Sequence, residues 1–360
     1  MIPGWEEIGA WSQQCLAKVP TDVLAGKMPA ALYGMGFLGR WALPQLKLLG
    51  IDIQTCFDGN TALDGSRIDG TPVHASDRLA EQRPAFTFIA ARHAVPAVAA
   101  MLAGLGLVSV SCDAFWAARQ MTSFETIHHD LLSDDRSQLV LRAVLATMLT
   151  GDRRYLQEAF DRDQYFCLPP FLGVEPEIYV DAGAYVGDSL ERFIWAHYGV
   201  FRKAIAFEPG PRQRAALELR VDRLKAEWAL EDERIEIVPA ALGARSGTAL
   251  AASQSGHMTS LALDGEGSTE IQIESLDAYL AGARASFIKA DVEGMEMDLL
   301  EGAQSTITTY RPRLAICVYH YPTDIPTISH YLKSLVPDYR FALRHHSPQL
   351  METVLYAWVD

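Results

Sequence analysis

Acidic side chains follow three apolar segments in the second half of the chain. Asp181 ends the run IYVD, Glu208 follows IAF, and Asp291 ends FIKAD. In an open parallel sheet the ligand lies beyond the carboxyl ends of the strands, so we expect these carboxylates to share one edge. Acidic groups repel a pyrophosphate. The pattern therefore favours a cationic cofactor that carries an amino acid moiety and a sulfonium.

A small-residue turn follows the first of these segments, in the run DAGAYVGD at 181–188. Gly183 and Gly187 are expected to let a ligand approach the backbone between a strand and a helix. A dinucleotide site would instead show three glycines spaced GxGxxG. The alternative interpretation is a tight turn without a ligand.

The other two acidic positions have more specific expected roles. Glu208 stands where a carboxylate accepts hydrogen bonds from a ribose diol, with a solvated residue at a strand end as the alternative. Asp291 is expected to face the methionine part of the cofactor or the acceptor hydroxyl. Glu296 follows in the first turn of a helix, where the helix dipole alone favours an acidic residue.

His320 follows the fifth apolar segment of this half, beside the Asp291 segment in the expected topology. Its ordinary pKa near neutrality makes it a candidate general base, and an ordinary hydrogen-bonding residue is the alternative. A further alternative is that Asp291, Glu293 and His320 hold a divalent metal such as magnesium. We expect catalysis without a metal.

The first half carries its own glycine turn, in which Gly34, Gly36 and Gly39 match GxGxxG and Asp58 ends the next apolar segment. A single match of this type is not specific. Two interpretations remain open. The turn binds a nucleotide-sugar, or it keeps the scaffold of such a site without the ligand.

Alternating apolar segments and helical patterns predict an α/β protein with two sheets. We expect an α/β leader domain at 1–120, a helical connector at 121–176 and a second domain at 177–360. An extra hairpin is expected within 243–273, turning at 265–267. In the second domain the last two strands should pair antiparallel, which gives seven strands with one reversed edge. The predicted strands are at 30–33, 51–57, 86–90 and 107–111, then at 178–181, 203–207, 235–239, 287–291, 314–319, 339–344 and 353–358.

The composition limits the classes of function. The net charge of −14 disfavours binding to nucleic acid or to anionic membranes. The five cysteines show no paired spacing, which argues against disulfides and zinc and fits a reducing cytoplasm. The first residues resemble no secretion signal, and no apolar run reaches the roughly 18 residues of a membrane span. We therefore expect a cytoplasmic protein.

Four motifs in order, DAGAYVGD, AFEP, IKADVEGMEMDLLEGA and ETVLYA, resemble the FkbM family of methyltransferases over about residues 165–360. The resemblance implies a class I methyltransferase sheet of Rossmann-like type. It also implies methyl transfer from S-adenosylmethionine to a hydroxyl oxygen, often on sugars or polyketide-type products, and cofactor contacts at Asp181, Gly183 and Glu208. Many members carry a glutamate after the fifth strand where this sequence has Tyr319 and His320, which leaves the base open.

The segments LTGDRRYL and DQYF resemble the part that precedes the core in a long-chain branch of this family. Tyr165 would then close over the cofactor, where an aromatic face gains ~0.5 to 2 kcal/mol from a nearby cation. A core tyrosine is the alternative. The predicted catalytic set is His320, Asp291 and Glu293, and the predicted cofactor-binding set is Asp181, Gly183, Ala184, Tyr185, Gly187, Asp188, Glu208, Pro209, Asp291 and Tyr165.

The leading hypothesis is an S-adenosylmethionine-dependent O-methyltransferase that acts on a sugar, glycan or natural product. One alternative is an NAD(P)-binding oxidoreductase that uses the first glycine turn, and another is a non-catalytic sugar-binding or assembly protein. A homo-oligomer is compatible with the sequence. Further candidates for the acceptor pocket are His345, His346, His257, Thr259 and Ser260.

Overall fold

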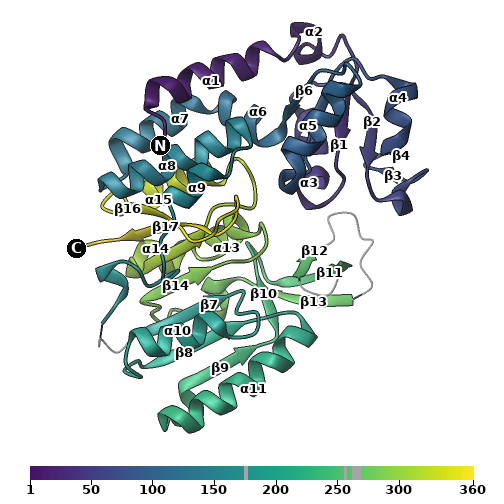
Figure 1. Ribbon diagram of the computed structural model, residues 1–360. Helices are drawn as coiled ribbons and strands as arrows, with labels where there is room; N and C mark the ends of the chain where they lie inside the picture. The colour runs from purple at the N-terminus through teal and green to yellow at the C-terminus, as the bar shows by residue number, and fades with distance from the viewer. Residues whose placement is uncertain (174–176, 255–257, 262–268) are drawn as a thin grey trace.

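The computed structural model describes the backbone of residues 1–173, 177–254, 258–261 and 269–360. Two sheets organise the chain, a six-stranded sheet near the N-terminus and a seven-stranded sheet in the second half, and helices lie between and around them (Figure 1). This arrangement confirms the predicted α/β class with two Rossmann-like units.

The seven-stranded sheet has the order β16-β17-β15-β14-β7-β8-β9. Five neighbouring strands from β15 to β9 run parallel, and β17 pairs antiparallel with both β15 and β16. The predicted antiparallel pairing of the last two strands is confirmed. The reversed strand is nevertheless not at the edge, because β17 inserts between β15 and β16. The strands are β7 Ile178–Ala182, β8 Lys203–Phe207, β9 Ile235–Val238, β14 Phe287–Ala290, β15 Arg313–Cys317, β16 Arg340–His345 and β17 Thr353–Trp358.

Helices connect the parallel strands of this sheet and cover its faces (Figure 1). Helix α10 begins after Gly187, whose φ of +83° lies in the left-handed region that glycine adopts without strain. Helix α11 begins with Pro211 at its first position, where the missing N–H of proline costs no hydrogen bond. The helices are α10 Asp188–Ala196, α11 Pro211–Trp228, α12 Leu276–Leu280, α13 Glu296–Gly302, α14 Gln304–Tyr310 and α15 Asp324–Leu335, with short 3₁₀ helices η5 Pro169–Phe171 and η6 Asp232–Arg234.

The segment between β9 and β14 forms a separate small sheet of order β10-β13-β11-β12. Strands β11 and β12 pair antiparallel, and β13 pairs antiparallel with the other side of β11. The hairpin formed by β11 and β12 is joined across 255–257 and is therefore not the one predicted to turn at 265–267. The turn predicted at 265–267 lies outside the described residues. The strands are β10 Ala240–Leu242, β11 Gly247–Gln254, β12 Met258–Leu261 and β13 Thr269–Glu274.

The N-terminal sheet has the order β3-β4-β2-β1-β5-β6. Strands β2, β1, β5 and β6 match the predicted segments, whereas the short pair β3 and β4 was not predicted. The elements are β1 Ala30–Tyr33, α3 Phe37–Leu48, β2 Ile53–Asp58, η1 Thr61–Leu63, β3 Arg67–Ile68, β4 Thr71–Ala75, η2 Ser76–Arg78, α4 Leu79–Gln82, β5 Thr87–Ile89, η3 Arg92–Ala94, α5 Val95–Gly104 and β6 Ser109–Ser111.

A group of helices links the two sheets. Helix α8 packs on α1, α6 and β16, and buried side chains of these helices share one apolar cluster with the seven-stranded sheet. Asp134 caps the start of helix α8 by accepting a hydrogen bond from Ser137 N–H, and Gly151, with φ of +76°, follows its last residue. The helices are α1 Trp5–Ala17, α2 Thr21–Leu24, α6 Cys112–Arg119, α7 Met121–Thr126, the π-helix η4 Ile127–Leu131, α8 Asp135–Thr150 and α9 Arg154–Glu158. Among the described residues, no helix combines the length and apolar character that crossing a bilayer requires.

Candidate active site

One large cavity of about 1290 Å³ lies between the two sheets. Residues at or just after the carboxyl ends of β1, β2 and β5 line it from the N-terminal domain. The corresponding residues after β7, β8, β14 and β15 line it from the second domain. Both sheets therefore direct their ligand-binding edges into the same space.

The turn after β7 brings backbone to the cavity wall. Gly183 lines the cavity with φ of +72°, and a Cβ at this position would lie 1.8 Å from the carbonyl oxygen of Asp291. Only glycine fits such a close contact between the β7 turn and the β14 turn. Tyr185 and Asp188 also line the cavity, as does Pro209 after β8.

Glu208 lines the cavity just beyond β8 and is 5% exposed. Its Oε2 accepts a hydrogen bond from Tyr185 N–H at 2.9 Å, and its Oε1 accepts one from Gly210 N–H at 2.7 Å. Burial raises the pKa of Glu208, and these backbone donors oppose that rise. The carboxylate is thereby held in a fixed position beside the glycine turn.

Asp181 is placed differently from the prediction, because it lies behind the cavity wall. It is fully buried, accepts a hydrogen bond from Ser189 Oγ at 2.6 Å and pairs with Lys289 Nζ at 3.1 Å. The Lys289 ammonium neutralises this charge, so Asp181 does not present a free carboxylate to a cationic ligand. Lys289 also donates to the carbonyl of Gly183 at 2.7 Å and lines the cavity itself.

Two further members of the predicted cofactor set do not line the cavity. Ala184 is fully buried in the apolar cluster around α10 and α11. Gly187 packs against α11, where a Cβ would lie 2.7 Å from Leu217 Cδ1. Both residues shape the turn from behind.

Asp291 is held by two tyrosine hydroxyls. Tyr165 O–H donates to its Oδ2 and Tyr319 O–H to its Oδ1, each at 3.0 Å. These donors, together with the charges of Lys289 and His320, outweigh burial and lower the pKa of Asp291. The ring face of Tyr165 is occupied by the Lys289 ammonium, 5.3 Å from its centroid.

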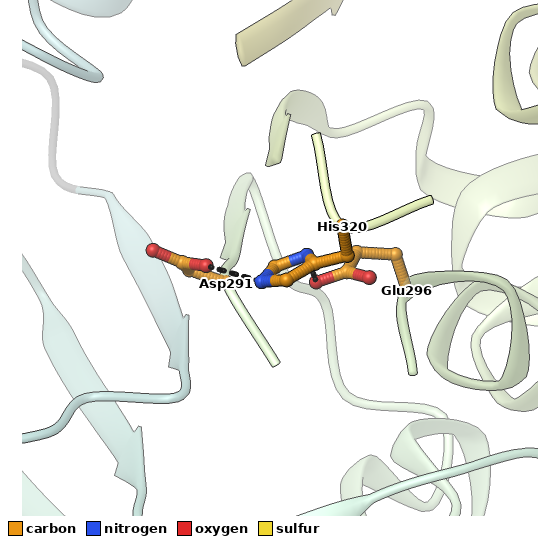
Figure 2. Close-up of side chains that lie close together, drawn as sticks. All are labelled: Asp291, Glu296 and His320. Carbon is orange, nitrogen blue, oxygen red and sulfur yellow. Dashed lines mark ion pairs between the residues drawn. The ribbon is translucent and has the colours of Figure 1, made fainter. Parts of the chain in front are cut away.

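His320 is surrounded by carboxylates, as Figure 2 shows for two of them. Its Nδ1 pairs with Glu296 at 3.1 Å, while Nε2 lies 3.7 Å from Asp291 and 3.6 Å from Glu293. Although burial opposes the charged form, these acids raise the pKa of His320 well above its ordinary value. A raised pKa favours the protonated imidazole, which disfavours His320 as the predicted base.

The same protonation bears on the metal alternative. Donor atoms of Asp291, Glu296 and His320 lie within 4.8 Å of one another, which is a spacing that a metal ion could bridge. Binding a metal there would require the His320 imidazole to lose a proton. In the described structure the contacts between these acids and the His320 ring are ion pairs.

Glu352 is a cavity residue that the sequence reasoning missed, in the loop between β16 and β17. It has a left-handed backbone with φ of +60°, and Gln164 Nε2 donates to its Oε2 at 2.5 Å. One of its carboxylate oxygens lies within 4.8 Å of a carboxylate oxygen of Asp291 and of the sulfur of Cys317. Burial and the charge of Asp291 raise the pKa of Glu352. The available signal was the motif ETVLYA, which begins with this glutamate.

The N-terminal glycine turn meets the same cavity. Gly34 and Gly36 line it, whereas Gly39 lies behind, where a Cβ would come within 1.8 Å of the Gly34 carbonyl oxygen. Asp58 also lines the cavity. The predicted sites of the two halves are therefore brought together, a relation that the sequence did not indicate.

Arg92 joins the two domains beside this cavity. It forms a bidentate pair with buried Asp113 and donates to the carbonyl oxygen of Tyr319 at 2.5 Å. Nearby, Tyr321 stacks on Phe37 at 5.3 Å and on Trp41 at 4.9 Å between ring centroids. The segment that carries His320 is thus packed directly against the N-terminal domain.

Asp324 gives this region a pH dependence that can be measured. Burial, with the charge of Glu296 second, raises its pKa from 3.8 to about 7. Between those values the folded state binds a proton that the unfolded state has lost, so stability is present at low pH and falls as pH rises towards 7. Asp324→Asn should remove this pH-dependent loss of stability, because an amide does not titrate. The fold should be kept, since the amide oxygen still accepts from Tyr321 N–H.

Between pH 5 and pH 8, the free energy of unfolding of the wild type should fall by on the order of 2–3 kcal/mol more than that of Asp324→Asn. Urea unfolding at each pH measures this free energy. His320 titrates in both proteins and does not alter the direction of the comparison. Equal pH dependence in the two proteins would show that Asp324 is ionised throughout.

The remaining acceptor-pocket candidates do not join the site. His345 is fully buried and pairs with Thr353 Oγ1, and His346 contacts the carbonyl of Asp161, so neither lines the cavity. His257 and the side chains of Thr259 and Ser260 lie outside the described residues.

Comparison with known proteins assigns the class. Residues 181–344 match the family model of the methyltransferase FkbM domain. The solved structure of a methyltransferase FkbM from Methylobacillus flagellatus is similar over 98% of this chain and 98% of its own, with 22% identity and a TM-score of 0.59. An rRNA methylase from Streptococcus thermophilus is 17% identical, covering 52% of this chain and 90% of its own, with a TM-score of 0.33. No curated protein matches the chain.

The chain is therefore a methyltransferase, as predicted. Its second half contains a methyltransferase domain of the FkbM family. The likeness to the Methylobacillus structure extends over both domains, so the pairing of the two α/β units belongs to the shared fold.

Proposed function

We propose that this chain transfers a methyl group from S-adenosylmethionine to a hydroxyl oxygen of a sugar, glycan or natural product. The observation that carries the proposal is the joint placement of the Gly183 turn, Glu208 and Asp291 on one cavity wall. The cofactor supplies an electrophilic methyl group on a sulfonium. The chain's own residues bind and orient it and manage the acceptor proton.

The cofactor-holding residues fit such a group. Gly183 forms part of the cavity wall, and Glu208 beside it is placed to accept hydrogen bonds from ribose hydroxyls. Tyr185, Asp188, Pro209 and Asp291 complete the cofactor side of the wall. Asp181, behind the wall, pairs with Lys289, which lines the cavity and donates to the Gly183 carbonyl.

The acceptor proton is best taken by Glu352. Both oxygens of Asp291 are engaged by tyrosine hydroxyls, and His320 already holds a proton. Within the described residues, Gln164 binds Oε2 of Glu352, which leaves Oε1 for an acceptor hydroxyl. The pKa of Asp291 is lowered, whereas that of the neighbouring Glu352 is raised. The carboxylate with the raised pKa is the better general base.

The cofactor assignment predicts a specific loss on replacing Glu208. Hydrogen bonds to a charged acceptor are worth about 1.5–3 kcal/mol, so Glu208→Gln should weaken S-adenosylhomocysteine binding about 10- to 100-fold. Isothermal titration calorimetry measures this directly. The control is Glu218→Gln at an exposed position of α11. The only described ion pair of Glu218 is a 3.9 Å contact with Arg214.

These measurements distinguish an error in the ribose site from an error in the proposed function. Unchanged affinity in Glu208→Gln would remove Glu208 from the ribose site. A wild type that gives no heat with S-adenosylhomocysteine, and that transfers no radiolabelled methyl group to an acceptor extract, would overturn the proposed function itself.

A further inference from the structure

The two domains place a carboxylate beside a glycine turn in the same way. In the second domain, Glu208 accepts from Tyr185 N–H in the glycine turn and from Gly210 N–H two residues further on. In the N-terminal domain, Asp58 accepts from Met35 N–H in the glycine turn at 2.5 Å. It also accepts from Asn60 N–H two residues further on, at 2.7 Å.

The supporting strands correspond as well. Strand β1 pairs parallel with β2, as β7 does with β8, and each carboxylate stands at or just after the end of the second strand. Gly34 and Gly183 both have positive φ, of +95° and +72°. The N-terminal domain therefore repeats the construction that holds a ribose in sites of this kind.

The cavity is large enough for two ligands. Pockets for one small molecule are typically about 300–1,000 Å³, and this cavity is about 1290 Å³. Gly36 lines the N-terminal part, and a Cβ at Gly36 would meet no atom within 4 Å. This side of the cavity therefore has open space next to the glycine turn.

The cavity wall is divided by charge. The N-terminal side carries Arg40, Arg92 and Arg153 against the single acid Asp58, whereas the other side carries five acids, Asp188, Glu208, Asp291, Glu293 and Glu352, against Lys289 and His320. Arg92 is neutralised by Asp113. Arg40 Nε is buried and has no hydrogen-bond partner within the described part of the chain. A basic wall that faces an acidic one suits an anionic ligand beside a cationic cofactor.

We propose that the N-terminal domain is a second nucleoside site, which binds the methyl acceptor as a ribonucleoside phosphate conjugate. Asp58 accepts from the ribose hydroxyls, the open turn at Gly36 admits the phosphates, and Arg40 lies on their side of the cavity. The group to be methylated extends towards Asp291 and Glu352. Its role as acceptor rests on the proposed function, whereas nucleotide binding does not.

The test is calorimetric titration of the full chain with ADP, GDP, CDP and UDP, with and without saturating S-adenosylhomocysteine. At least one diphosphate should bind when the cofactor product is present, and its 2′-deoxy form should bind at least 10-fold more weakly. Arg40→Gln should weaken binding and lower its salt dependence, because one charge opposite the phosphates is lost.

Two variants locate the site. Gly36→Val places a side chain in open cavity space at a residue with φ of −73°, so the fold should tolerate it while nucleotide affinity falls at least 10-fold. Asp58→Asn should abolish the preference for ribose over deoxyribose. The matched control, Glu208→Gln, should weaken S-adenosylhomocysteine and leave the nucleotide affinity unchanged. Unfolding midpoints check that each variant is folded.

The inference is overturned if none of the four diphosphates binds, or if folded Gly36→Val and Asp58→Asn bind them like the wild type. The latter result would place the nucleotide elsewhere, such as in the cofactor site. Nucleotide binding without any S-adenosylhomocysteine binding would instead contradict the proposed function while supporting the N-terminal site.

Discussion

Replacing Glu352 by glutamine is expected to lower kcat by about 10²- to 10⁴-fold, the usual contribution of a general base. Glutamine keeps the size of the side chain but cannot take a proton from the acceptor hydroxyl. Affinity for S-adenosylhomocysteine should change little, because Glu208 and the Gly183 turn lie on other strands. Single-turnover transfer of a radiolabelled methyl group, at saturating cofactor, measures the effect.

The pH profile distinguishes a base from a positioning residue. Since the pKa of Glu352 is raised, the wild-type rate should climb with pH as this carboxyl loses its proton. The rate of Glu352→Gln should lack this rise with pH. Gln164→Ala should move the rise to a different pH, because Gln164 donates a hydrogen bond to Oε2 of Glu352. Glu301→Gln, at an exposed position of α13, serves as the control. A Glu352→Gln enzyme with wild-type kcat and the same acid limb would transfer the role of base to another group.

Replacing Lys289 by methionine is expected to destabilise the fold by about 3–5 kcal/mol, as happens when one partner of a buried ion pair is removed. Asp181 would then carry an uncompensated charge at a fully buried position, and the Gly183 carbonyl would lose its donor. The cofactor site should weaken together with the fold. Urea unfolding and S-adenosylhomocysteine titration measure the two losses.

A double-mutant cycle isolates the pair. Asp181→Asn combined with Lys289→Met should recover part of the stability, because the amide still accepts from Ser189 and neither charge of the pair remains. Lys203→Met removes a half-exposed partner of Glu236 and should cost no more than about 1 kcal/mol. If Lys289→Met unfolded at the same urea concentration as the wild type, the buried pair would have no structural role.

The edge where acidic groups gather was predictable because parallel strands end on the same side of a sheet. Glu208 and Asp291 needed only the positions of their strands, and both line the cavity. Asp181 has the same sequence signature but lies behind the wall. Its neutralisation depends on Lys289, which lies next to it across the β7–β14 pairing.

Protonation states were less accessible to sequence reasoning. His320 has an ordinary pKa near neutrality, and the rise depends on Glu296, Glu293 and Asp291 closing around the ring. Glu352 reaches the site through a loop, whose path no periodicity reveals. The meeting of the two sheets across one cavity depends on the packing of the intervening helices, a long-range property that local patterns do not contain.

The aromatic contacts at Tyr321 have a consequence for turnover. Tyr321 is the neighbour of His320 and stacks on Phe37 and Trp41 of α3, the helix that starts at the N-terminal glycine turn. If product leaves by a hinge movement of the two domains, this stacking must break, and the strand end that carries the imidazolium must shift with it. Opening of the cavity would then coincide with the displacement of His320 and its neighbours. The open enzyme would therefore not transfer the methyl group to water.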